Sequence, residues 1–230
     1  MKLIHSLSAS TFVLTLLAAG CAQAPDSDKA TVGDAQEVAI SASTSTAIVD
    51  TENSKVEWVG TKVTGRHNGV LHLTNGSLDM KDGSLVGGNF TLDMTSLTTS
   101  DKMGAENGLT DHLKSADFFD VANHPTAEFV ITGVKALESV TPDTEQVPEI
   151  DQYRVSNPTH EISGNLTIKG VTKNITFPAA VQISGLGTKA TAKFNINRND
   201  WGISYPGKPD DLIRETVHIG IALKASVPAS

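Results

Sequence analysis

The chain has 230 residues, of which 39% are hydrophobic and 19% are charged, and this balance indicates a globular domain. Its formal net charge is -8, and an acidic surface repels phosphate backbones, so we expect no nucleic-acid partner. The one cysteine, Cys21, can form neither an internal disulfide nor a thiolate metal site by itself.

The first 20 residues have the pattern of a signal peptide. Lys2 and His5 precede an apolar run, Thr11 to Ala19, which is about half of the ~20 residues that span a bilayer. The run leads to Leu17-Ala18-Ala19-Gly20-Cys21, which resembles a bacterial lipobox, where cleavage exposes a cysteine that receives lipid such as palmitate. The resemblance implies a lipid anchor on Cys21 and a bacterial envelope location, outer-membrane or periplasm-facing. The alternative is an ordinary secretory signal that is cleaved nearby.

The segment from residue 21 to residue 50 is rich in Ala, Ser, Thr, Asp and Gln and has no periodic apolar pattern. Such a composition favours a disordered tether that lets a folded domain stand off the membrane.

From residue 51 to residue 228 the apolar residues recur at every second position, which places them on one face of successive strands. The pattern predicts an all-β, antiparallel barrel of about eight strands, because closure removes exposed strand edges. A two-sheet sandwich remains the alternative. The clearest runs are Val56 and Trp58; Phe90, Leu92 and Met94; Ala127, Phe129 and Ile131; Leu166 and Ile168; Ala190, Ala192, Phe194 and Ile196; and Val217, Ile219, Ile221, Leu223 and Ala225.

Turn chemistry separates these runs. Asp82-Gly83 and Lys169-Gly170 predict tight turns with positive φ. The pattern breaks near 110–117, where we expect a short helix close to a barrel mouth. Residues 136–152 and 199–215 are expected to be long exposed loops.

Nothing in the sequence favours catalysis. Seven histidines are present, but no His-x-x-x-His or His-Glu-x-x-His spacing occurs, so no metal site is expected. The Gly-x-Ser-x-Gly pattern of an activated serine is absent, as is a glycine-rich phosphate loop. We therefore expect a protein that is not an enzyme and has no cofactor.

Three segments, in order and spacing, resemble the YceI-like family over about residues 51–227. They are Leu109–Asp120 continuing to His124–Phe129, Ile162–Lys173, and Phe194–Gly202. The resemblance implies a lipocalin-like barrel that closes near a short helix. In some members the barrel holds a polyisoprenoid or fatty-amide chain, so a bound isoprenoid or lipid-like ligand is expected here.

The inward positions include many small residues, which favours a hollow barrel with an apolar cavity over a filled one. Core packing explains the candidate ligand-binding residues equally well or better. We also expect Arg198 and Asp200 to form a pair that pins the following loop. A filled barrel, acting as a stress-response or protein-interaction module, is the alternative, and a homodimer stays open. The candidate ligand-binding residues are Trp58, Phe118, Phe119, Phe129, Phe194 and Trp201.

Overall fold

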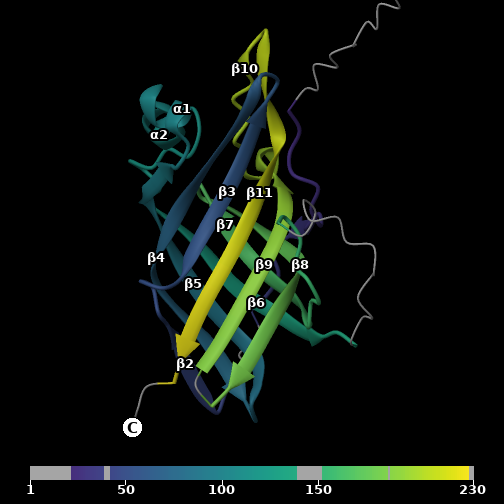
Figure 1. Cartoon of the computed structure of the whole chain (residues 1–230). Coiled ribbons are helices and arrows are strands. Elements are labelled where there is room, and N and C mark those ends of the chain that lie inside the picture. Colours follow the sequence, from purple (N-terminus) through teal and green to yellow (C-terminus); the bar gives the residue numbers. More distant parts are fainter. Residues whose placement is uncertain (1–21, 39–41, 139–151, 186, 228–230) are drawn as a thin grey trace, which may run out of the picture.

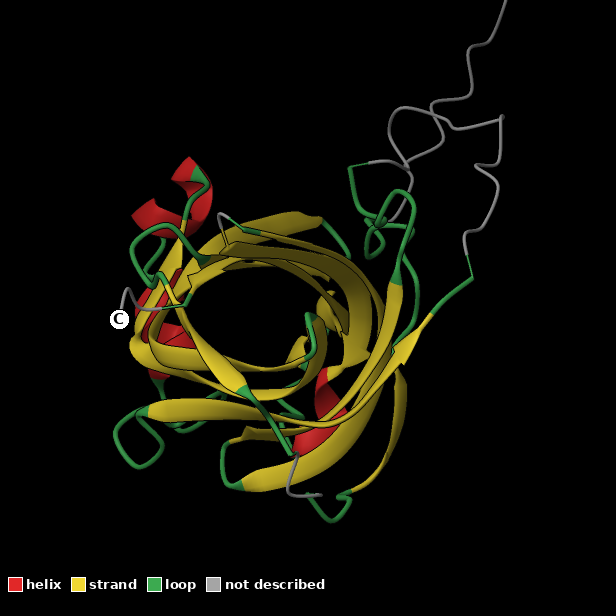
Figure 2. Ribbon diagram, turned by 90° about the horizontal axis from the view of Figure 1, so that it is seen from below, coloured by secondary structure: helices red, strands yellow, loops and turns green. Residues whose placement is uncertain are grey.

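The computed structural model describes residues 22–38, 42–138, 152–185 and 187–227. Within them, eight strands pair antiparallel, each with the next, and the last returns to the first, so the sheet closes into a barrel (Figures 1 and 2). This confirms the predicted barrel and excludes the sandwich. The barrel strands are β3 (Lys55–Lys62), β4 (Gly65–Lys81), β5 (Ser84–Thr99), β6 (Thr126–Ala136), β7 (His160–Ile168), β8 (Val171–Ser184), β9 (Gly187–Asn197) and β11 (Asp211–Ser226).

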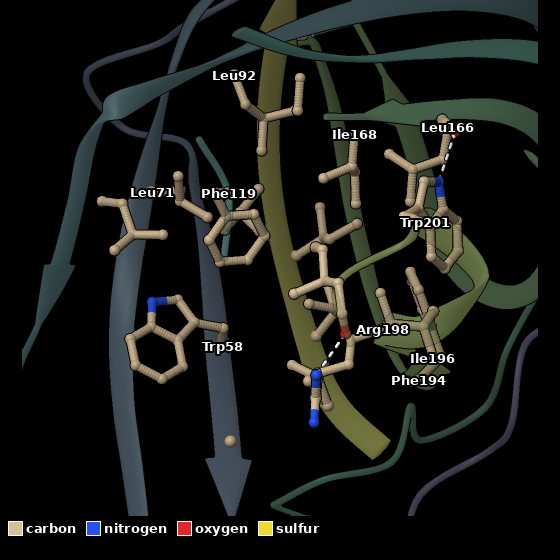
Figure 3. Close-up of a pocket in the computed structure, with 18 of the residues that line it drawn as sticks. Trp58, Leu71, Leu92, Phe119, Leu166, Ile168, Phe194, Ile196, Arg198 and Trp201 are labelled. Atoms are coloured by element: carbon tan, nitrogen blue, oxygen red, sulfur yellow. Dashed lines mark hydrogen bonds between the residues drawn. The ribbon is translucent and has the colours of Figure 1, made fainter. Parts of the chain in front are cut away.

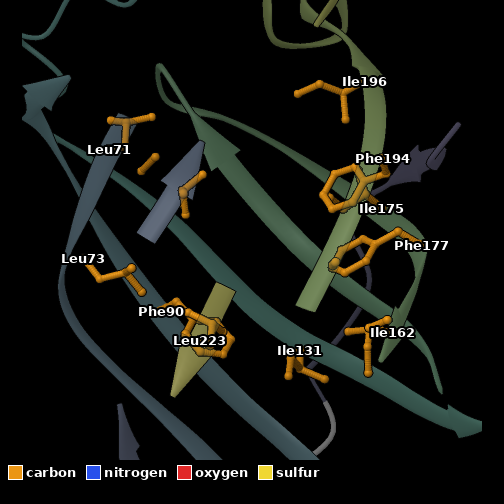
Figure 4. Packing of buried hydrophobic residues seen from close by; sticks show 14 of the residues in the cluster. Leu71, Leu73, Phe90, Ile131, Ile162, Ile175, Phe177, Phe194, Ile196 and Leu223 are labelled. Atoms are coloured by element: carbon orange, nitrogen blue, oxygen red, sulfur yellow. The ribbon is translucent and has the colours of Figure 1, made fainter. Parts of the chain in front are cut away.

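The alternation of the sequence produces the core. Successive side chains of a strand point to opposite faces, and in a closed barrel one of these faces is the lumen. Figure 4 shows buried side chains from facing strands, such as Leu73, Ile162 and Leu223, directed toward the interior.

Two predicted turns are confirmed. Asp82 and Gly83 have φ of 50° and 77°, and Lys169 and Gly170 have φ of 50° and 73°. Positive φ at both central residues gives a turn whose twist matches the flanking strands.

Two short helices, α1 (Lys102–Glu106) and α2 (Leu109–Lys114), connect β5 to β6 at the upper end of the barrel in Figure 1. The expected helix near 110–117 is present as α2, whereas α1 was not predicted. The carboxylate of Asp101 caps α1 by accepting from the backbone N–H of Gly104 at 2.7 Å. No helix within the described ranges is long and apolar enough to cross a membrane.

The prediction of a long loop over residues 199–215 is wrong for most of this segment. It contains part of a 3-10 helix, η1 (Arg198–Trp201), then β10 (Gly207–Lys208), and β11 already begins at Asp211. β10 pairs with the start of β11. Most of the other expected loop, 136–152, lies outside the described residues, because these do not include 139–151.

The expected pair of Arg198 with Asp200 is also wrong. The guanidinium of Arg198 is buried, and it donates to backbone carbonyls on both sides of the 203–213 turn. Two of these carbonyls lie between η1 and β10 and two lie near the start of β11, and the five N–H groups of one arginine can satisfy several acceptors. Burial lowers the pKa of Arg198. The carbonyls belong to Ile203, Tyr205 (2.8 Å), Ile213 (3.3 Å) and Arg214 (3.1 Å).

The expected tether over residues 21–50 is contradicted by two strands. β1 (Thr31–Asp34) pairs with β8, and β2 (Ser45–Val49) pairs with both β4 and β11. The folded unit therefore begins well before residue 51.

β1 covers a place where two neighbouring barrel strands, β8 and β9, separate. β8 pairs with β9 only over Ala179–Ser184, whereas its earlier residues, Lys173–Thr176, pair with β1. On the other side, the backbone of Asn195 in β9 pairs with Asp28 and Ala30, at 2.7 and 3.0 Å. Residues 22–34, which we call the strap, thus satisfy backbone groups that separated strands would leave open.

Side chains fix the strap to the outer face of the barrel. The amide of Asn195 donates to the carbonyl of Pro25 at 2.9 Å, and Ser27 donates to the carbonyl of Tyr153 at 2.6 Å. Asn195 is held in turn by the buried ring of His218, 3.0 Å from its amide oxygen.

We predict that Gly164→Ala destabilises the barrel. An added Cβ would lie 2.2 Å from Cζ of Phe129 and 2.8 Å from the carbonyl oxygen of Val130. Overpacking of this kind costs about 1–3 kcal/mol, measurable by urea denaturation. Gly133→Ala is the matched control, because its nearest neighbour, Ser163 Cβ, is 3.8 Å away. Equal stability of the two variants would contradict the prediction.

We predict that stability falls on mild acidification through His218. Burial, assisted by the positive charge of Lys193, lowers the pKa of His218 from 6.5 to about 4. As the pH falls from 6.5 to 4, the unfolded chain binds a proton that the folded chain excludes, so the free energy of unfolding decreases. The slope from this group is at most about 1.4 kcal/mol per pH unit. Denaturation of His218→Gln at about pH 7 and about pH 5 should show a flatter dependence, and an unchanged dependence would rule out His218 as the source.

Candidate functional site

A cavity of about 750 Å³ lies inside the barrel (Figure 3). Its wall is built from inward-facing side chains of the eight barrel strands, together with residues from the helical segment and the 198–214 turn. Cavities of this size enclose most of the surface of a small organic ligand.

The free surface of the cavity is apolar. Several inward residues remain only partly buried, and the cavity is the space that they border. Apolar groups beside such a space lack packing partners on one side. These residues are Leu92, Leu166, Ile168, Ala190, Val217, Ile219 and Ile221.

All six aromatic residues proposed from the sequence lie on the cavity wall, but with different exposure. Phe119 and Phe129 are partly exposed, whereas Phe194 is 2% exposed and Trp201 is 0% exposed. The indole N–H of Trp201 donates to the carbonyl of Leu166 at 3.0 Å, as Figure 3 shows. Trp201 therefore supports the wall, while Phe119 and Phe129 keep part of their surface exposed on it. Trp58 and Phe118 are also on the wall and buried.

A row of four rings follows one side of the cavity. The ring centroids of Phe90 and Phe129 are 6.3 Å apart, those of Phe129 and Phe177 are 5.7 Å apart, and those of Phe177 and Phe194 are 4.2 Å apart. The rings come from β5, β6, β8 and β9, so the register of four strands creates the row. Gly164 leaves the space that the ring of Phe129 occupies.

The two ends of the cavity differ in polarity. At the upper end, Lys62 pairs with Asp211 at 2.6 Å, and His67 contacts Asp101 at 3.0 Å. This end, which we call the mouth, also includes Lys208, and Lys62, His67, Lys208 and Asp211 all line the cavity. The opposite end is apolar: the side chains of Ala47, Val49, Met80 and Ala225 are buried there without lining the cavity.

Electrostatics at the mouth keep its carboxylates charged. Burial acts to raise the pKa of Asp101, but hydrogen bonds from His67, Gly104 and Asn68 outweigh it and hold the pKa below its usual value. The hydrogen bond from Lys62 is the largest cause of the lowered pKa of Asp211. These charges favour water at the mouth and an apolar chain deeper inside.

Three rings narrow the mouth. His112 in α2 makes edge contacts with Phe118 and Tyr205, with ring centroids 5.0 and 4.9 Å apart. Phe118 and Tyr205 are 5.3 Å apart. The cluster joins the helical segment to the turn that Arg198 holds, so the two lining elements at the mouth support each other.

The chemistry that this wall offers is burial of apolar surface. Among the described residues, no group of three or more His, Cys, Asp or Glu side chains is placed to hold a metal ion. The ligand-binding candidates proposed from the sequence were all aromatic, and they did not include the aliphatic residues that border the cavity. Their alternation in β11, at Val217, Ile219 and Ile221, was the signal that could have found them.

Comparison with known proteins supports the same fold. The chain is similar to the crystal structure of Burkholderia cenocepacia BcnA, with a TM-score of 0.59 and 21% identity, covering 77% of this chain and 99% of that one. It is also similar to a polyisoprenoid binding domain from Saccharophagus degradans implicated in plant cell wall breakdown, with a TM-score of 0.57 and 15% identity, covering 79% and 98%.

Relatives in sequence are UPF0312 proteins. One from Pseudomonas putida strain W619 is 36% identical over 102 residues, covering 42% of this chain and 44% of the relative. One from Pseudomonas fluorescens strain SBW25 is 34% identical over 119 residues, covering 49% and 50%. The chain thus spans about half the length of these relatives.

The model of the YceI-like domain matches residues 48–225, which is most of the chain and runs from before β3 to the penultimate residue of β11. The protein therefore belongs to the YceI-like family.

Proposed function

We propose that this protein binds one long apolar molecule, of the polyisoprenoid or acyl-chain class, inside the barrel, and that it acts as a carrier and not as an enzyme. The observation that carries the proposal is the set of inward aliphatic residues left partly exposed around a cavity of about 750 Å³. The YceI-like barrel is a fold that suits apolar ligands, and a structural relative is described as a polyisoprenoid binding domain.

The energetics favour a chain-like ligand. Each buried methylene contributes about 0.8 kcal/mol, so a tail that fills the cavity gains affinity in proportion to its buried length. Ordering of a flexible chain opposes this gain, and observed affinities stop near about -20 kcal/mol. Cavity length should therefore select tail length, since most of the residues that line the cavity are apolar.

A filled-barrel interaction module is the weaker alternative. It requires inward side chains that meet across the lumen, and the cavity runs against that requirement.

Organic extraction of the purified folded domain followed by mass spectrometry tests the ligand. We expect a prenyl or acyl compound in the extract of the unmodified domain and much less from Ala190→Phe, whose ring would enter the cavity. Lys189→Phe is the control, because Lys189 is the exposed neighbour on the same strand and its ring would point outward. An empty unmodified domain that also fails to take up added prenyl lipid would contradict the proposal.

We further propose that Cys21 carries the lipid that anchors the protein in the bacterial envelope. Removal of the acyl chains removes about 0.8 kcal/mol of membrane affinity for each buried methylene, so Cys21→Ala should move the protein from the membrane fraction to the soluble fraction. Fractionation and immunoblotting of cells check this, with Ala22→Ser as the neighbouring control. Sedimentation of Cys21→Ala with membranes would show that the anchor lies elsewhere.

A further inference from the structure

The path of the strap determines where Ala22, the residue that follows Cys21, lies relative to the cavity. The strap is fixed to the barrel wall at several points along its length, through β1, Ala30, Pro25 and Ser27. An ion pair between Asp26 and Arg154, 2.8 Å long, adds a further contact. The strap is therefore part of the barrel surface and does not let the domain drift from residue 21.

The first described residue of the strap reaches the mouth. The backbone N–H of Ala22 donates to the carbonyl of Val63 at 3.4 Å, and the N–H of Val63 donates to the carbonyl of Leu212 at 3.1 Å. Val63 lies in the β3–β4 turn and Leu212 in the β10–β11 hairpin. Figure 1 shows the strap, in purple, starting beside β10 and running down the outside of the barrel.

The same two turns border the cavity. Lys62 precedes Val63, Asp211 precedes Leu212, and both Lys62 and Asp211 line the mouth. Ala22, which is joined directly to Cys21 in the chain, therefore lies at the rim. A free tether of this composition would instead allow a separation of about 30 Å.

We propose that the mouth of the cavity faces the membrane surface, held there by the strap, so that an apolar ligand passes between bilayer and barrel without crossing bulk water. This inference rests on the proposed lipid at Cys21 and the proposed apolar ligand. Passage through water would expose the tail at about 0.8 kcal/mol for each methylene, and contact between mouth and bilayer removes that barrier.

Exposed apolar residues occur at both ends of the barrel, so they do not by themselves indicate which end contacts the membrane. Met103 and Leu212, at the mouth end, are 63% and 47% exposed, but Ile48, at the opposite end, is 49% exposed. These side chains nevertheless provide matched positions for a test, because each is exposed and the barrel does not depend on it for packing.

The test uses the full-length lipidated protein in vesicles of phosphatidylethanolamine and phosphatidylglycerol that contain nitroxide-labelled lipid. Leu212→Cys and Ile48→Cys each add one free thiol, since the single native cysteine carries the lipid, and each is labelled with the same fluorophore. We expect the label at residue 212 to lose fluorescence to the nitroxide lipid and the label at residue 48 to keep it.

A second variant ties the result to the strap. A flexible Gly-Ser segment inserted between residues 21 and 22 preserves every strap contact and lets the domain move away, so quenching at residue 212 should fall. The inference would be overturned if quenching were equal at both residues, stronger at residue 48, or unchanged after the insertion. None of these results would contradict the lipid anchor itself. Failure of the protein to sediment with the vesicles would overturn the anchor and the inference together, and ligand extraction would still test the cavity separately.

Discussion

The inward side chains of the barrel are too small to meet across the space that eight strands enclose. Alanines at 127, 190 and 192 and slender aliphatic residues along β11 occupy positions where a solid barrel would need larger groups. Close packing is what normally stabilises a protein interior, and an apolar void forfeits those contacts. Water does not replace them well, because a water molecule in an apolar cavity lacks hydrogen-bond partners. The fold therefore carries an apolar surface that a ligand chain could cover.

Other features of the structure maintain this hollow arrangement. Arg198 fixes the turn beside the mouth through backbone carbonyls, and Trp201 supports the wall through the carbonyl of Leu166. The row of phenylalanine rings stiffens one side, where Gly164 provides the room. At the far end, Ala47 and Val49 of β2 are packed in the core. One end of the barrel is thus apolar, and the other has a polar mouth.

Much of the fold could be predicted because period-two alternation and two-residue turns are local signals. The inward face of β11 could be predicted from the alternation of Val217, Ile219 and Ile221. Two turns could be predicted from the dipeptides Asp82-Gly83 and Lys169-Gly170. The strap could not be predicted, because its strand Thr31–Asp34 is four residues long and pairs with residues 139 to 145 positions away. The partners of Arg198 were equally hidden, because they are backbone carbonyls, which every residue has and no sequence pattern marks. The six aromatic positions could be proposed from the sequence, but their different exposures depend on the packing around each ring.

The strap also changes how the N-terminal region is understood. Composition alone suggested a spacer, yet Asn195, Tyr153 and Arg154 hold this segment against the barrel. The proposed anchor and the proposed ligand cavity are then linked by geometry, since the same turns border the cavity and receive the start of the strap.

The most direct test of a hollow, ligand-holding barrel is a crystal structure of the domain purified from its native host without detergent. Continuous elongated electron density along Leu166, Val217 and Ile219 is the expected result. A lumen in which the surrounding side chains have collapsed together, or which contains only ordered water, would contradict it.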